Sequence, residues 1–116
     1  MSGSPLAASK CMELFELLRN QPYFAGLARA TALAAESDLA KAAPIYQSLD
    51  WWGGSGSLAD SAGADLPRIQ KKQLLALIAD IRDIFHDAGI DYDRADMWAD
   101  TFRSWLRDGV FDQEPS

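Results

Sequence analysis

The residues of this sequence that could do chemistry are mainly aspartates, and they gather in its last third. Residues 80–116 hold ten acidic and four basic residues, whereas residues 1–79 hold seven of each, so the net charge of −6 lies entirely in the former. Seven of these ten acidic residues follow one another at helical spacings or after short gaps: Asp80, Asp83, Asp87, Asp91, Asp93, Asp96 and Asp100. Such carboxylates would attract a basic protein and repel nucleic acid, although they could also form a merely solvated helix face.

A second candidate is the stretch Trp-Trp-Gly-Gly-Ser-Gly-Ser-Leu-Ala-Asp over residues 51–60. Glycine-rich backbone can cradle a phosphate. However, the spacing matches neither the P-loop nor the dinucleotide fingerprint, no lysine follows, and Asp50 and Asp60 would repel an anion. A structural turn is the other interpretation. The residues that we expect to contact a partner are Trp51, Trp52, Ser55, Ser57 and Asp60, with one tryptophan buried and the other partly exposed.

Signatures of catalysis and of metal binding are missing. His86 and Cys11 are the single histidine and cysteine, too few for a zinc site. A nucleophile elbow around Ser55 would need glycine where Ser57 stands. Residues 91–96 open like a calcium loop but lack its third ligand position and its glycine. The sequence therefore predicts no enzyme, no catalytic residue, no metal and no cofactor, with Cys11 in the core and His86 complementing a helix end.

Composition indicates the fold that must position these residues. The chain has 19 alanines and 14 leucines but only nine isoleucine, valine and threonine residues together, which favours helices over strands. Its length suits one domain, residues 1–116. We predict an all-α fold, a single compact bundle of about five helices. Residues 1–4 and 112–116 are expected to be disordered.

Periodicity predicts where these helices lie. Apolar spacing and caps place them over residues 5–19, 22–35, 38–43, 67–88 and 93–108. Pro44 should end or kink the third, with a kink or fresh turn following it. Residues 53–66 are rich in glycine, serine and alanine, and we expect them to form a loop between the third and fourth helices. The helix over residues 67–88 has the widest apolar stripe, which predicts a central position.

Compartment and membrane association can also be predicted. A single cysteine excludes an intrachain disulfide and fits a reducing compartment. The N-terminus does not read as a secretory signal, and no apolar run approaches the roughly 20 residues of a membrane span. We expect a cytoplasmic protein that binds neither membrane nor nucleic acid.

The stretch Gly53–Asp60, Gly-Gly-Ser-Gly-Ser-Leu-Ala-Asp, resembles the Gly-Gly-Met-Gly-Ser-Leu-Asn-Asp-type loop of a family of small bacterial helical domains of unknown function. Ser55 replaces the methionine and Ala59 the asparagine, and the resemblance covers roughly residues 12–88. It implies no established activity. In size and charge the chain is also similar to toxin-immunity proteins.

These features lead to two hypotheses of function. The first is a non-enzymatic protein-binding domain, most concretely an immunity-type inhibitor that neutralises a basic toxin through the acidic helical face. The alternative is a small-ligand or anion-binding domain that uses the glycine-rich loop.

Overall fold

The computed structural model describes residues 2–112, and it folds them into seven helices without any strand. The helices are α1 (Pro5–Leu17), α2 (Pro22–Ser37), α3 (Leu39–Tyr46), α4 (Leu49–Trp52), α5 (Leu58–Ser61), α6 (Arg68–Asp87) and α7 (Asp93–Arg107). The prediction of an all-α chain is confirmed. The helix count of about five was too low, because the segment that we predicted to be a loop contains helical turns.

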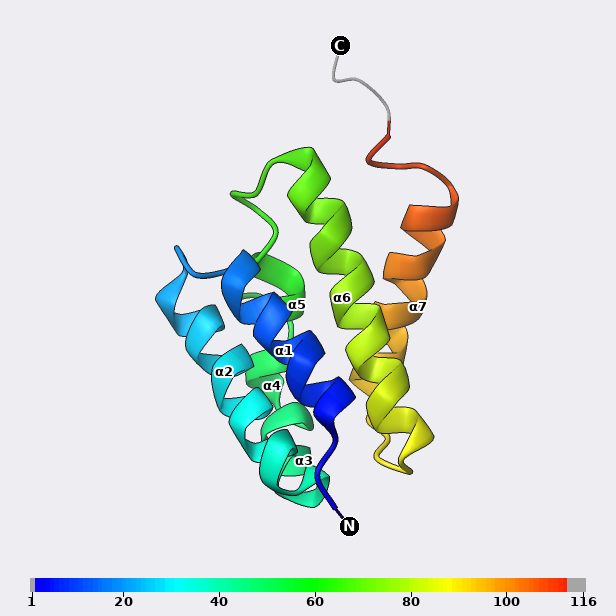
Figure 1. Ribbon diagram of the computed structural model, residues 1–116. Coiled ribbons are helices and arrows are strands. Elements are labelled where there is room, and N and C mark those ends of the chain that lie inside the picture. The colour runs from blue at the N-terminus through cyan, green and yellow to red at the C-terminus, as the bar shows by residue number, and fades with distance from the viewer. Residues whose placement is uncertain (1, 113–116) are drawn as a thin grey trace.

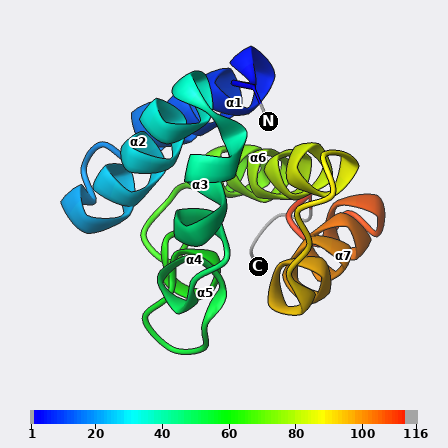
Figure 2. The same ribbon diagram turned by 90° about the horizontal axis from the view of Figure 1, so that it is seen from below.

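Four long helices form a curved layer, and the short helices fill its inner side. In the view from below in Figure 2, α2, α1, α6 and α7 follow one another around an arc that partly encloses α3, α4 and α5. In Figure 1, α6 lies between α1 and α7, as its wide apolar stripe predicted. The Cα radius of gyration is 13.5 Å, close to the roughly 13 Å expected for a packed domain of this length.

Small side chains bring α1 and α2 together. The buried face of α2 consists of Ala25, Ala28, Ala32 and Ala35 with Thr31, and α1 lays Ala7, Cys11 and Leu14 in the core. Residues 2–4, which we expected to be disordered, join this pair: the Ser4 hydroxyl accepts a hydrogen bond from Ala7 N, and Ser4 N donates to Ala35 O at 2.8 Å. Met1 lies outside the described residues.

The chain between α2 and α6 is more regular than we predicted. α3 continues through Pro44 to Tyr46. Proline has no N–H, so Pro44 costs the helix one backbone hydrogen bond, and the burial of Tyr46 holds the last residues of the helix in place. α4 and α5 are single turns begun by Ser48 and Ser57, whose hydroxyls accept from Trp51 N and Asp60 N. The predicted 53–66 loop was therefore wrong as a structureless segment. Its unrecognised signal was Ser57-Leu58-Ala59-Asp60, a helix-capping pattern.

α6 and α7 form an antiparallel pair. Gly89, with φ of 82°, ends α6, and residues 88–92 then return the chain directly into α7. Asp93 is the first helical residue of α7, and Tyr92 occupies the N-cap position. After α7 the chain remains described to Asp112, whose carboxylate pairs with Lys72. Residues 113–116 lie outside the described residues, so the predicted disorder there is not addressed.

The centre of the molecule is an aromatic cluster. Tyr46 stacks on Phe85 with ring centroids 4.0 Å apart, and it meets Trp52 edge-on at 5.5 Å. Trp51 stacks on Trp52, again at 5.5 Å. These four side chains come from α3, α4 and α6, so they join the short inner helices to the layer. Within the described chain, no helix combines the length and apolar character that crossing a membrane requires.

Candidate functional site

The seven aspartates that we selected from the sequence form what we call the acidic face, made by Asp80, Asp83, Asp87, Asp91, Asp93, Asp96 and Asp100. It extends along α6, through the following loop and along α7. The antiparallel pairing of the two helices accounts for its assembly, because the C-terminal half of α6 then lies beside the N-terminal half of α7. The sequence did not predict that basic side chains are interleaved with these carboxylates.

Arg82 is the hub of this face. Its guanidinium donates to Asp83 from Nε at 2.8 Å, to Asp96 from Nη1 at 3.2 Å and to Asp100 from Nη2 at 3.1 Å. Burial opposes its charged form, since only 14% of the side chain is exposed, but these hydrogen bonds outweigh burial and raise the pKa of Arg82. One α6 side chain therefore holds two carboxylates of α7.

Arg103 and Lys10 extend the network on both sides of α6. Arg103 of α7 donates from Nη2 to Asp80 at 3.0 Å and to Asp83 at 2.6 Å. Lys10 of α1 lies 3.8 Å from Asp80. Asp80 thus links α1 with α7 across α6, and four carboxylates that would repel one another are fixed by interleaved cations.

The remaining three aspartates differ in their surroundings. Asp91 pairs with Nδ1 of His86, and the hydrogen bond together with the negative charge raises the pKa of His86. Asp87 and Asp93 are exposed and form no ion pair within residues 2–112. They are the two carboxylates of the acidic face that have no ion pair in the described part of the chain.

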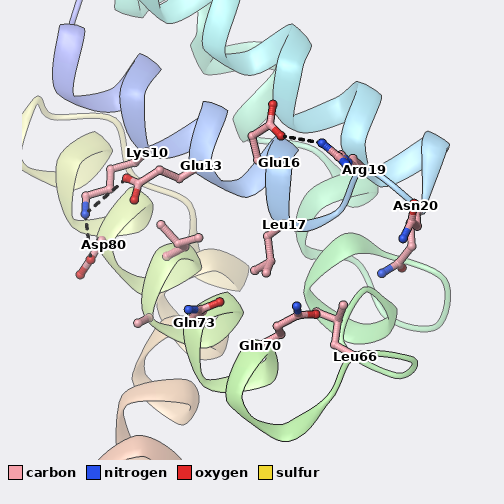
Figure 3. Close-up of a pocket in the computed structure, with 13 residues that line it drawn as sticks. Lys10, Glu13, Glu16, Leu17, Arg19, Asn20, Leu66, Gln70, Gln73 and Asp80 are labelled. Atoms are coloured by element: carbon pink, nitrogen blue, oxygen red, sulfur yellow. Dashed lines mark hydrogen bonds and ion pairs between the residues drawn. The ribbon is translucent and has the colours of Figure 1, made fainter.

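A groove between α1 and α6 adjoins the acidic face. It encloses about 780 Å³, and Figure 3 shows side chains from the two helices facing each other across it. Leu17, Leu66 and Leu77 supply its apolar surface, while Gln70 and Gln73 present amide groups that can both donate and accept hydrogen bonds.

The ends of the groove are charged. Glu16 and Arg19 pair at 3.5 Å, and Lys10 lies 3.7 Å from Glu13. Because Asp80 lines the groove and also binds Arg103, the groove and the acidic face form one continuous surface on the exposed side of α6.

The tryptophans that we selected are not on this surface. Trp51 and Trp52 are both completely buried, so the expectation that one would be partly exposed was wrong. Each serves the core: Trp51 Nε1 donates to the Thr31 hydroxyl at 3.1 Å, and the Trp52 carbonyl accepts from Trp98 Nε1 at 3.1 Å. The hydrophobic gain of burying two indoles prevailed over any role at an interface.

The glycine-rich stretch is closed on itself. Ser57 is buried, and its hydroxyl donates to Gly53 O at 2.6 Å while capping α5. Gly56 N donates to the Ser61 hydroxyl, and Ser57 N donates to Gly54 O. Several donors that an anion would need are therefore already engaged, and Ser61 also donates to the Asp60 carboxylate. Ser55 and Asp60 remain exposed.

Cys11 is buried between α1 and its neighbours as expected, and this burial raises the pKa of its thiol to about 12. Over the described part of the chain, no three histidine, cysteine or acidic side chains are grouped in a way that could hold a metal ion.

Arg82 and Arg103 are the important residues that sequence reasoning missed. A usable signal existed: a five-residue connection makes neighbouring helices antiparallel, which places Arg82 opposite the turn containing Asp96 and Asp100. Counting charges along the chain cannot reveal this pairing, because it depends on the register between two helices.

Comparisons of this chain with models of protein families, with curated proteins and with solved structures found no match.

Proposed function

We propose that this chain is a non-enzymatic protein-binding domain that docks a basic partner on the exposed side of α6, most concretely an immunity-type inhibitor of a basic toxin. The observation that carries the proposal is the fixing of Asp80, Asp83, Asp96 and Asp100 by Arg82 and Arg103. The same ion pairs join α6 to α7, and they hold these four carboxylates in fixed positions on the surface.

Preorganisation is the physical benefit of this network. Each carboxylate can accept several hydrogen bonds, so one that is bound to an arginine keeps acceptor capacity for a partner. Because the side chains are already ordered, a partner loses less conformational entropy on binding them. The arginines would thus present the carboxylates of α6 and α7 as an array of defined spacing.

The charge balance supports a basic partner. Seven aspartates are opposed by Arg82, Arg103 and Lys10, which leaves an excess of four negative charges with His86 neutral. A field of this kind steers a cationic protein towards the surface and falls off with salt. The groove beside it supplies leucines and amides for shorter-range contacts.

Asp87 and Asp93 offer the sharpest test, because reversing them leaves the arginine network intact. The variant Asp87→Lys/Asp93→Lys should fold, since lysine is favourable near the C-terminus of α6 and this offsets part of its cost at the N-terminus of α7. Bait made from the wild-type chain should capture a basic protein from lysate of the native host at low salt, with mass spectrometry identifying it.

The control carries the same change of net charge elsewhere. Glu36→Lys/Asp65→Lys alters two exposed acids outside the acidic face. We expect the control to keep the captured partner and the Asp87→Lys/Asp93→Lys variant to lose it, with binding of the purified pair weakening as salt rises. Equal capture by all three baits, or a partner that is not basic, would refute the proposal.

A further inference from the structure

A second cavity lies between α5, α6 and α7, on the side of α7 away from the acidic face. Its aromatic wall comes from Trp98, Phe102 and Trp105 of α7, which follow Asp96, Asp100 and Arg103 by two positions and so lie about 200° around the helix from them. Phe111 completes the wall, because the chain folds back after α7 with Val110 N donating to Trp105 O at 3.1 Å.

The rings form a continuous aromatic surface. The centroids of Trp98 and Phe102 are 5.5 Å apart, those of Phe102 and Trp105 5.7 Å, and those of Trp105 and Phe111 6.3 Å. Phe102 is buried, whereas 37% of Trp105 is exposed, so the wall runs from the core to the surface. Such a wall can stack against an aromatic ring.

The opposite wall is made of small residues, which is why the space stays open. Ala59, Gly63 and Ala64 line it, and Leu74 and Leu75 form an apolar base. The enclosed volume is about 280 Å³, near the lower end of the range for small-molecule sites. Even one added carbon at Gly63 would come within 3.1 Å of Leu74 Cδ2.

Two opposite charges border this apolar space. Asp60 and Lys71 both line it, and they form no ion pair with each other. Among residues 2–112, the Asp60 carboxylate accepts a hydrogen bond from the Ser61 hydroxyl alone, and the Lys71 ammonium group has no hydrogen-bond or ion-pair partner. The neighbouring Lys72, in contrast, is paired with Asp112, and that pair ties the segment bearing Phe111 to α6.

We propose that this cavity binds a small aromatic zwitterion of the amino-acid type. The ring would lie against Trp98, Phe102 and Trp105, its ammonium group would meet Asp60, and its carboxylate would meet Lys71. An apolar ligand would leave both charges unused, and a ligand of one sign would be attracted by one group and repelled by the other. The inference does not depend on the proposed function, because it uses none of the acidic face.

Four compounds that share a phenyl group separate these contributions: phenylalanine, phenethylamine, 3-phenylpropionate and ethylbenzene. They do not absorb where tryptophan is excited, so fluorescence of Trp98 and Trp105 can report binding, with calorimetry giving the affinity. We expect phenylalanine to bind at least about tenfold more tightly than each of the others, as one charge-assisted contact implies. Any other order of affinity, or no binding, overturns the proposal.

Variants of the full chain locate the site. Lys71→Met keeps the aliphatic stem, and we expect it to weaken phenylalanine binding about tenfold while leaving ethylbenzene unaffected. Lys41→Met is the matched control at an exposed position outside the cavity. Ala64→Leu, at an exposed position of the wall, should abolish binding of all four compounds without unfolding the chain. Unchanged binding in Lys71→Met or Ala64→Leu places the ligand elsewhere and overturns the assignment.

Discussion

Trp51 donates its indole N–H to the hydroxyl of Thr31 at 3.1 Å, and both side chains are completely buried. The Thr31 hydroxyl in turn donates to Leu27 O within α2 at 2.8 Å. This chain of hydrogen bonds satisfies an indole that would otherwise be a buried polar group without a partner. It fixes α4, a helix of only four residues, against the long helix α2.

Thr31→Val should therefore destabilise the fold by about 1–3 kcal/mol, because it keeps the side-chain volume but leaves the Trp51 N–H unsatisfied. Chemical denaturation monitored by circular dichroism gives the free energy of unfolding. The control is the same substitution in a Trp51→Phe background, where no indole N–H remains and Thr31→Val should cost much less. Additive effects of the two substitutions would show that the bond contributes nothing.

Arg82→Met should destabilise the chain more than Arg103→Met does. Arg82 is mostly buried and bonded to three carboxylates, so its loss should cost about 1–3 kcal/mol and leave Asp83, Asp96 and Asp100 to repel one another. Arg103 is 46% exposed, and its loss should cost less than about 1 kcal/mol.

Urea denaturation of both variants at neutral pH measures the difference between their free energies of unfolding. Equal losses at neutral pH would contradict the role of Arg82 as the hub.

His86 should titrate above the ordinary histidine pKa of about 6.5, because Asp91 stabilises the imidazolium. A raised pKa in the folded state means that the stabilisation is complete below the unfolded pKa and is lost as the pH rises through the folded one. Since this is the single histidine, its ring resonances in a proton NMR titration need no assignment.

Asp91→Asn should bring the pKa of His86 back towards its ordinary value and remove this pH dependence of stability. Asp87→Asn is the matched control. Asp87 acts on His86 only through its negative charge, and this charge makes the smallest contribution to the raised pKa of His86. A titration curve of His86 that is the same in Asp91→Asn as in the wild type would refute the pairing.

Gly53→Ala and Gly54→Ala test whether the fold needs the close backbone approach in the glycine-rich stretch. A Cβ at Gly53 would lie 2.6 Å from Leu49 O, so backbone must shift, and we expect a loss of about 1–3 kcal/mol. A Cβ at Gly54 meets nothing within 4 Å, and its substitution should be close to neutral. Thermal unfolding compares the two, and equal melting temperatures would show that the close approach at Gly53 is unimportant.

Much of the framework could be predicted from local patterns. Alanine and leucine content, apolar spacing and prolines in the first turn located α1, α2, α6 and α7 to within a few residues, because helix formation depends on neighbours in the sequence. The short connection at residues 88–92 could also be predicted from the sequence. The single turns α4 and α5 were missed, since four residues carry too little periodicity and only their serine caps reveal them.

By itself, the sequence determined that the chain is helical, that its negative charge is concentrated after residue 79 and that seven aspartates could share a surface. Only the tertiary structure decided that Arg82 and Arg103 bind four of these aspartates and that Trp51 and Trp52 belong to the core. The reason is physical: propensity and charge are properties of residues and their close neighbours. Burial and ion pairing depend on distances between residues far apart in the chain, which packing alone sets.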